Sequence, residues 1–262
     1  MGGPWLKKHL TGPAITALGK RKERRSFSKA PILIGGCARS GTTLLLAILS
    51  AHPRLFCFPK ETDAFTEWTH HKGRLIPIRP DRMYRQLLLT KVPETAHRWC
   101  EKRPYNVLHI PEILAYFGSE ARFIHLVRDP RAVCTSTHPE NPAEYWVSPE
   151  RYVRDVSEGL RHQNHPQVLT IRFEDLILHF DPTIRRVCEF IGEEVCPEII
   201  AWHAHAKVRS NRAWFTGLQD LQSEAIERWK VAVHKQRVDQ VMSYGGVREL
   251  MLKLGYGGVY DS

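Results

Sequence analysis

The strongest constraint on the fold is segment 31–44, which runs from a short apolar stretch through a glycine turn into a helical pattern. Residues 32–35 predict a buried strand, and residues 42–51 predict a helix. Between them, Gly36 and Gly41 let the backbone turn tightly, so that successive N–H groups point toward one centre. The start of the helix adds the positive end of its dipole. This segment therefore predicts a phosphate-binding loop at the edge of a sheet.

The side chains of the loop narrow down its ligand. Ser40, Thr42 and Thr43 supply hydroxyl donors, and Arg39 is the nearest cation. The spacing of the two glycines is that of the nucleotide-binding pattern G-x-x-x-x-G-K-[ST], but Thr42 stands where that pattern has lysine. Because that lysine contacts the β- and γ-phosphates, the loop is expected to bind a phosphate-rich ligand other than an ordinary nucleoside triphosphate.

The rest of the chain alternates short β-rich runs with amphipathic stretches, which predicts an α/β domain over residues 30–262. We expect a single domain with a P-loop-like central parallel sheet flanked by helices. The expected strands are Ile32–Gly35, Leu55–Phe58, Asn106–Ile110, Arg122–Val127 and Val168–Arg172. The expected helices are Thr42–Ala51, Asp81–Lys91, Pro130–Thr137, Pro149–His162, Asp181–Ile191 and Ser223–Leu254, the last with a break near Gly245.

Residues 1–29 are expected to form a basic, flexible extension. They include the cluster Lys20, Arg21, Lys22, Arg24 and Arg25. Such a segment is either a solvated arm or an arm that docks on a membrane surface or a partner.

The charge of the chain favours an anionic partner. With 38 Lys and Arg against 28 Asp and Glu, the formal net charge is +10. Nucleic acid, an anionic membrane, a polyanionic substrate or a phosphate-rich cofactor would each suit this charge. A composition of 42% hydrophobic and 25% charged residues is that of a globular protein and excludes a disordered or collagen-like chain.

The sequence also bears on the compartment. No apolar run approaches the roughly 20 residues of a transmembrane helix. The six cysteines show no CxxC pair and no metal-ligand spacing, so they are expected to be free thiols. We expect a cytoplasmic protein.

Two blocks of the sequence resemble a known family. Residues 36–45 resemble the 5′-phosphosulfate loop of sulfotransferases that use 3′-phosphoadenosine-5′-phosphosulfate (PAPS). Residues 123–136, in which a strand ends at Arg128 and Ser136 follows eight residues later, resemble the 3′-phosphate clamp of the same family. The resemblance implies PAPS as donor and implies these donor-binding residues: Arg39, Ser40, Gly41, Thr42, Thr43, Arg128, Ser136, and Arg209 and Ser210 in a loop that folds over the nucleotide in related enzymes.

Sulfuryl transfer needs a base for the acceptor and cations for the leaving phosphate, with both substrates held in line. Glu61 follows the second expected strand, and the resemblance to glycan and tyrosylprotein sulfotransferases implies that it is the general base. Asp63 is a second carboxylate nearby. Arg39 and Lys102 are implied to stabilise transferred charge, although Arg103 replaces the small hydroxyl residue of the family pattern Lys-[Thr/Ser]-Pro.

Purely structural roles are also compatible with the sequence around Glu61 and Lys102. Glu61 would also suit a surface ion pair with Lys60, and Lys102 a solvated cation at the end of an element. Residues 171–176 resemble the family's Arg-Tyr-Glu-Asp-Leu strand end, with Phe173 in place of tyrosine and Glu174 expected to be structural. The scheme requires no metal, and the sequence agrees, because its histidines lack carboxylate or cysteine partners at ligand spacing.

The acceptor is expected to be a carbohydrate or glycolipid hydroxyl, and an anionic glycan would suit the basic, aromatic segment between Trp68 and Trp99. The alternative functions are a P-loop-type kinase and a non-catalytic nucleotide- or nucleic-acid-binding protein. Thr42 argues against the kinase. The lack of a helix-turn-helix, zinc-finger or RNA-binding signature argues against nucleic acid.

Overall fold

The core of the protein is a parallel β-sheet. The structure is a computed structural model, and it describes residues 11–65, 68–69, 75–76, 78–138, 141–208 and 224–256. Its strand order is β2-β5-β1-β6-β7, and each neighbouring pair is parallel. The strands are β1 (Ile32–Gly36), β2 (Leu55–Cys57), β5 (Arg98–Lys102), β6 (Arg122–Val127) and β7 (Val168–Arg172). The expected α/β fold is confirmed, and all five strands end at one edge of the sheet.

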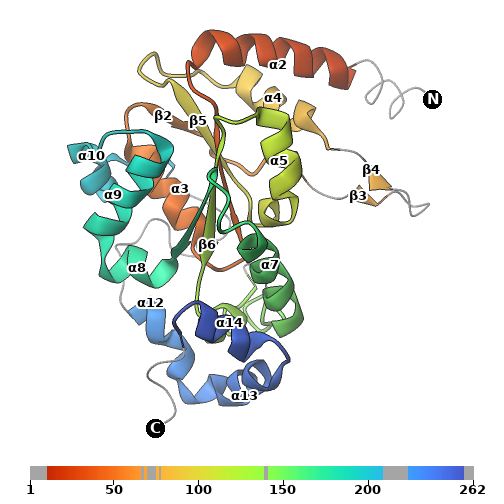
Figure 1. Cartoon of the computed structure of the whole chain (residues 1–262), viewed down its shortest axis with the longest axis vertical. Helices are drawn as coiled ribbons and strands as arrows, with labels where there is room; N and C mark the ends of the chain where they lie inside the picture. Colours follow the sequence, from red (N-terminus) through yellow and green to blue (C-terminus); the bar gives the residue numbers. More distant parts are fainter. Residues whose placement is uncertain are drawn as a thin grey trace.

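Helices cover both faces of the sheet, with α2 across its upper end and α12 to α14 at the lower end (Figure 1). Among the described residues, no helix is long and apolar enough to cross a membrane. The helices are α2 (Gly12–Ser26), α3 (Thr42–Ala51), α4 (Pro80–Leu89), α5 (Ile110–Phe117), α6 (Pro130–Cys134), α7 (Pro149–Arg161), α8 (Phe173–Leu178), α9 (Phe180–Ile191), α10 (Pro197–Ile200), α11 (Trp202–His205), α12 (Glu224–Glu227), α13 (Lys235–Ser243) and α14 (Val247–Lys253). Shorter elements are the 3₁₀ helices η2 (Pro104–His109), η3 (Arg228–Lys230) and η4 (Ala232–His234), and the antiparallel pair β3 (Trp68–Thr69) and β4 (Leu75–Ile76).

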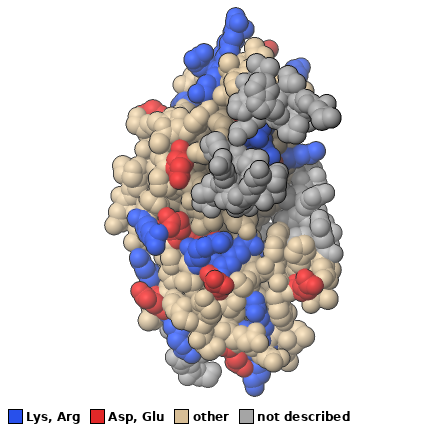
Figure 2. All heavy atoms as spheres, turned by 90° about the vertical axis from the view of Figure 1, so that its right-hand side faces the viewer, with Lys and Arg blue, Asp and Glu red and all other residues tan. Residues whose placement is uncertain are grey.

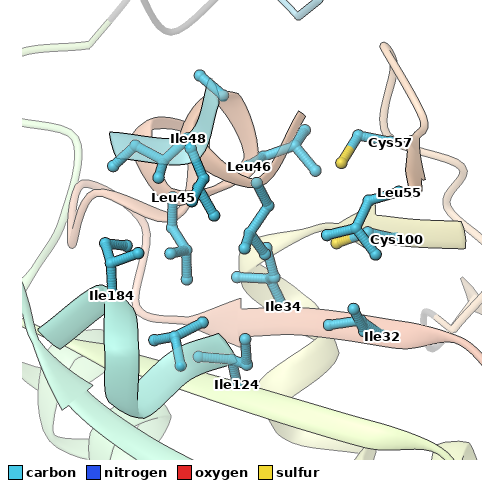
Figure 3. Packing of buried hydrophobic residues seen from close by; sticks show 14 of the residues in the cluster. Ile32, Ile34, Leu45, Leu46, Ile48, Leu55, Cys57, Cys100, Ile124 and Ile184 are labelled. Carbon is cyan, nitrogen blue, oxygen red and sulfur yellow. The ribbon is translucent and has the colours of Figure 1, made fainter. Parts of the chain in front are cut away.

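The alternation of side chains along β1 divides the core into two layers. Ile32 and Ile34 pack toward α3, where Leu45, Leu46 and Ile48 meet them (Figure 3). Leu33 points to the opposite face and belongs to a second cluster under α4 and α5. Both faces of β1 are therefore buried, which explains why the sequence of this strand is apolar throughout.

Four of the five expected strands are present, but the prediction for residues 106–110 is wrong. These residues form most of η2 and the start of α5, and the missing strand is β5. Pro104 begins the 3₁₀ turn, and proline is well suited to the first position of a helical turn. The strand β5 escaped prediction because Arg98, Glu101 and Lys102 are charged yet buried, which only specific partners in the folded chain allow.

Residues 12–26 differ from the flexible extension expected for residues 1–29, because they form helix α2 against α4. Glu23 accepts hydrogen bonds from Trp99 Nε1 at 2.7 Å and from the Tyr84 hydroxyl at 2.8 Å. Lys22 donates to the carbonyls of Leu88 and Thr90. A glutamate within the basic cluster thus anchors the helix. Near the other end of the chain, the expected break near Gly245 is confirmed between α13 and α14.

Cations cap the C-terminal end of α9, where helix carbonyls have no partner within the helix. Lys29 donates to the Gly192 carbonyl at 2.7 Å, and Arg122 donates to the Phe190 carbonyl at 3.2 Å. Arg98 donates to the Ile191 carbonyl between them. These side chains come from β5, from β6 and from the segment before β1, so they hold α9 to the N-terminal edge of the sheet.

His125 on β6 makes folding sensitive to acid. Its ring is fully buried, its Nδ1 lies 3.3 Å from Thr170 Oγ1, and burial lowers its pKa from 6.5 to about 3. Below pH 6.5 His125 is therefore protonated in the unfolded chain but stays neutral in the folded chain. The free energy of unfolding thus falls as the pH drops toward 3. A single such group costs about 1.4 kcal/mol per pH unit in this window.

We predict that His125→Gln makes the free energy of unfolding less dependent on pH. Between pH 7 and pH 5, the wild type should lose about 2 kcal/mol more than the variant in urea titrations. The exposed His203 provides the control: His203→Gln should keep the wild-type dependence. Equal pH slopes for His125→Gln and the wild type would contradict the assignment.

Candidate active site

The glycine loop between β1 and α3 is tightly enclosed. A Cβ at Gly36 would lie 2.2 Å from the carbonyl oxygen of Leu126 on β6. Gly41 has a φ of 91° and directly precedes Thr42, the first residue of α3. Arg39 has a φ of 71°, which is unusual for a residue with a side chain and costs roughly 1–3 kcal/mol. Such strain is typical of ligand-binding loops.

Arg128 joins this loop to the end of β6. Its Nη1 donates to the Arg39 carbonyl at 3.0 Å, and its Nη2 donates to the Ala225 carbonyl at 2.5 Å. Burial lowers the pKa of Arg128 to about 10, and the nearby charge of Arg39 acts in the same direction. Burial also lowers the pKa of Arg39, as does the charge of Arg228. Like charges are therefore held together with limited access to water, and an anion would stabilise them.

Phe173, the first residue of α8, links the loop to Arg128. The Arg128 guanidinium lies 4.3 Å from the centre of the Phe173 ring. The same ring fills the space beside Gly41, where a Cβ would come within 2.4 Å of it. Compared with the tyrosine of the family pattern, Phe173 lacks a hydroxyl. The structure shows that its ring packs against the loop and supports the guanidinium.

Ser136 lies just beyond α6, which ends at Cys134 rather than at Thr137 as expected. Its hydroxyl donates to the Ala132 carbonyl at 2.8 Å, and its carbonyl accepts from the Trp146 N–H at 3.0 Å. The Trp146 ring in turn lies 5.8 Å from the guanidinium carbon of Arg39. Trp146, which no sequence motif indicated, thus connects the two expected phosphate-binding blocks.

The remaining residues expected to bind the donor fall into two groups. Ser40, Thr42 and Thr43 are buried at the start of α3. Within the described part of the chain, Ser40 Oγ and Arg128 Nε are buried without a hydrogen-bond partner. Arg209 and Ser210 lie outside the described residues.

Glu61 forms an ion pair with Lys102. Lys102 Nζ lies 2.5 Å from Glu61 Oε1, and Arg103 Nε lies 3.8 Å from Oε2. The Lys102 side chain is only 2% exposed, whereas that of Glu61 is 36% exposed and open to a substrate. The alternative of a solvated Lys102 is therefore wrong. The cation at the carboxylate is Lys102 of β5, and the neighbouring Lys60 is exposed.

Asp63 is placed differently from Glu61. It pairs with Arg103 at 2.9 Å and lies 4.0 Å from Arg82. Its φ of 54° is in the left-handed region. Asp63 is thus paired with two arginines, whereas Glu61 contacts Lys102.

The residues present suit a donor with several negative charges. The loop offers the N-terminus of α3 and the unpartnered Ser40 hydroxyl, and Arg39 and Arg128 supply cations. Lys102 adds a cation beside the carboxylate. Across the described ranges, no group of three or more His, Cys, Asp or Glu residues could hold a metal ion.

Most of the chain matches a known protein family. Residues 31–197 match the model of the sulfotransferase family. The chain belongs to the sulfotransferase family. The expectation of a PAPS-dependent sulfotransferase is thereby confirmed, and the match covers both the glycine loop and the Arg128 block.

The curated relatives include protein-tyrosine sulfotransferases. A putative protein-tyrosine sulfotransferase of Caenorhabditis briggsae is 27% identical over 224 residues, which are 76% of this chain and 80% of the relative. The protein-tyrosine sulfotransferase of Drosophila melanogaster is 23% identical over 187 residues, 61% of this chain and 37% of that protein. The chain thus spans most of the first relative and less than half of the second.

Solved structures share the fold at low sequence identity. The sulfotransferase domain from the curacin biosynthetic pathway superposes with a TM-score of 0.58 at 16% identity, covering 87% of this chain and 97% of that domain. Mouse sulfotransferase SULT7A1, solved as a complex with PAP, has a TM-score of 0.54 at 15% identity, with 92% and 94% covered. At these identities the likeness shows the fold.

We predict that Phe173→Leu weakens binding of adenosine 3′,5′-bisphosphate (PAP) about tenfold, because a cation over an aromatic ring contributes roughly 0.5–2 kcal/mol. Calorimetric titration measures the dissociation constant of PAP for each variant. Phe173→Tyr keeps the ring and is expected to retain the affinity. Equal affinities for the Leu variant and the wild type would show that Phe173 does not support Arg128.

Proposed function

We propose that this sulfotransferase moves the sulfuryl group of PAPS to an acceptor hydroxyl, with Glu61 as general base. The observation that carries the proposal is the contact between the exposed Glu61 and the buried Lys102. This pair lies at the same edge of the sheet as the loop that holds Arg39, because β5 is the parallel neighbour of β1. The proposed base Glu61 and the cations Lys102 and Arg39 therefore lie at the same edge of the sheet.

The donor is proposed to bind across the ends of β1 and β6. Arg39 and the loop from Ser40 to Thr43 would hold the 5′-phosphosulfate, because the helix start and the hydroxyls converge there. Arg128 and Ser136 would hold the 3′-phosphate, since a guanidinium offers two parallel donors to a phosphate. The roles of Arg209 and Ser210 rest on the family resemblance alone.

The chain's own residues perform three tasks in this proposal. Glu61 accepts the proton of the acceptor hydroxyl, whose oxygen then forms a bond to sulfur. The bond between sulfur and the 5′-phosphate oxygen breaks, and Arg39 and the N–H groups at the start of α3 stabilise the charge left on the phosphate. Lys102 would orient Glu61 before transfer, and the family resemblance implies that this lysine approaches the sulfuryl group. The electron pair of the broken bond stays with PAP.

For the acceptor we propose a tyrosyl hydroxyl first, because the curated relatives include protein-tyrosine sulfotransferases. A carbohydrate or glycolipid hydroxyl is the second candidate. An anionic glycan would suit the arginines at 79, 82 and 103, although Asp63 and Asp81 pair with them. Lys and Arg side chains also gather near the middle of the face shown in Figure 2, next to acidic side chains. Either acceptor would meet Glu61 on its exposed side.

Two further expectations remain proposals. A cytoplasmic location is supported by the six cysteines, all of which are free thiols. Contact of the basic helix α2 with a membrane surface is supported by the exposure of Arg21, Arg24 and Arg25. Figure 2 shows Lys and Arg side chains at the upper end of the molecule, where Figure 1 places α2.

The donor is tested by calorimetry. We expect micromolar binding of PAP and none of ATP with magnesium or of a DNA duplex. Preference for ATP or DNA would contradict the proposal and favour the kinase or the nucleic-acid-binding alternative. Labelled sulfate transfer from PAPS to tyrosyl peptides, glycans, glycolipids and phenols then identifies the acceptor.

The base is tested by Glu61→Gln. Turnover should fall by about 10²- to 10⁴-fold, the range for a lost general base, while PAP affinity stays within about threefold of wild type. Asp63→Asn is the matched control and should lose less than tenfold. A Glu61→Gln enzyme with near-normal turnover would remove Glu61 from this role.

The 3′-phosphate clamp is tested by Arg128→Lys and Ser136→Ala. The 3′-phosphate takes no part in bond making, so both changes should weaken PAP binding more than they lower the rate at saturating donor. For Arg128→Lys we expect a loss of roughly 10- to 100-fold in affinity, because charge-assisted hydrogen bonds contribute about 1.5–3 kcal/mol. Unchanged PAP affinity in both variants would rule out this clamp.

A further inference from the structure

A buried carboxylate lies directly beneath the loop that carries Glu61. Glu101, the residue before Lys102 on β5, is only 1% exposed. Its Oε1 accepts from the backbone N–H of Thr62 at 3.1 Å and from the Thr62 hydroxyl at 3.0 Å. Its Oε2 accepts from Asn106 Nδ2 at 2.7 Å. The carboxylate thus has three donors from two segments outside its own strand.

Stability of the core does not account for this carboxylate. Removing a charge from water is costly, and burial raises the pKa of Glu101 even though its hydrogen-bond donors act in the opposite direction. Apolar side chains in place of Glu101 and its side-chain partners would fill the core without that cost. Glu101 instead fixes the orientation of the loop, because it accepts hydrogen bonds from both the N–H and the hydroxyl of Thr62.

Glu101 and Lys102 both contact the loop that carries Glu61. Two successive residues of β5, Glu101 and Lys102, hold two successive residues of the loop, Thr62 and Glu61. The side chain of Asn106 also donates to the carbonyl of Ile34 at 3.2 Å. Since β1 leads into the phosphate loop, the network ties the loop of Glu61 to the strand that precedes the donor site.

We propose that Glu101 is a positioning residue for sulfuryl transfer, which acts through Thr62 to hold Glu61 against Lys102. This inference rests on the proposed role of Glu61 as base. Glu61 is one-third exposed on a loop outside the sheet, and among the described residues its side chain contacts Lys102 and Arg103. Misplacement of a reacting group by about 1 Å can cost 10²-fold in rate. A carboxylate that secures the neighbouring residue prevents such misplacement.

The test uses two variants that remove hydrogen bonds with little change in shape. In Glu101→Gln the new amide donor would face either Asn106 or Thr62, both of which donate in the wild type, so at least one contact is lost. Thr62→Val removes the hydroxyl and keeps the N–H. We expect kcat to fall about 10- to 100-fold in Glu101→Gln and about 3- to 10-fold in Thr62→Val. The KM for PAPS and the affinity for PAP should stay within twofold of wild type.

Two further variants separate positioning from general stability. Thr62→Ser restores the hydroxyl and should recover most of the lost kcat. Thr95→Val removes the hydroxyl of an exposed threonine that donates to Pro53, and it should leave kcat unchanged. If Glu101→Gln does not fold, the comparison of Thr62→Val with Thr62→Ser still decides the question.

A double-mutant cycle tests the route through Glu61. If Glu101 acts through the base, Glu61→Gln combined with Glu101→Gln should have about the same kcat as Glu61→Gln alone. Multiplied losses, a wild-type kcat in Glu101→Gln and Thr62→Val, or a failure of Thr62→Ser to recover activity would each overturn the inference. A wild-type protein without sulfuryl transfer, or an active Glu61→Gln, would instead overturn the proposed function, so the two failures are distinguishable.

Discussion

The parallel register of β1 between β5 and β6 is the constraint on which the rest of the site depends. Ile34 lies opposite Lys102 on one side and opposite Ile124 on the other. The glycine loop, Lys102 and Arg128 therefore lie at the C-terminal ends of three adjacent strands, β1, β5 and β6. A slip of one residue would turn every side chain of β1 to the opposite face, and Ile32 and Ile34 would leave the cluster beneath α3. Packing of the apolar core thus sets the position of the charged groups.

The site concentrates buried charge at this edge. Arg39, Arg128 and Lys102 are cations whose access to water is limited, and the contacts among Arg39, Arg128 and Phe173 hold like charges together. A polyanionic donor would place negative charge beside Arg39 and Arg128 and stabilise this arrangement. Next to them, the shortest ion-pair contact of Glu61 is with Lys102, and that of Asp63 is with Arg103. This difference in the nearest cation supports the different roles proposed for the two neighbouring carboxylates.

Several parts of the molecule could be predicted because local pattern and tertiary role agree. The strand, glycine turn and helix of segment 31–51 appear as expected, since each position there suits its backbone conformation. The strand β5 could not be predicted, because Arg98, Glu101 and Lys102 look exposed until their partners are known. Likewise, the basic residues 20–25 suggest an arm, whereas Glu23 among them anchors a helix through Trp99 and Tyr84.

The amino-acid sequence alone determined the phosphate loop, the order of the two donor-binding blocks and the identity of Glu61 as the candidate base. The phosphate loop depends on residue types at short spacing, whereas the two donor-binding blocks and Glu61 are implied by resemblance to sequence motifs of the family. Only the tertiary structure decided that Lys102 is the partner of Glu61, that Phe173 supports Arg128, and that Glu101 holds the base loop. Those contacts join residues 39 to 45 positions apart, and their geometry exists only when parallel strands bring distant segments to one edge.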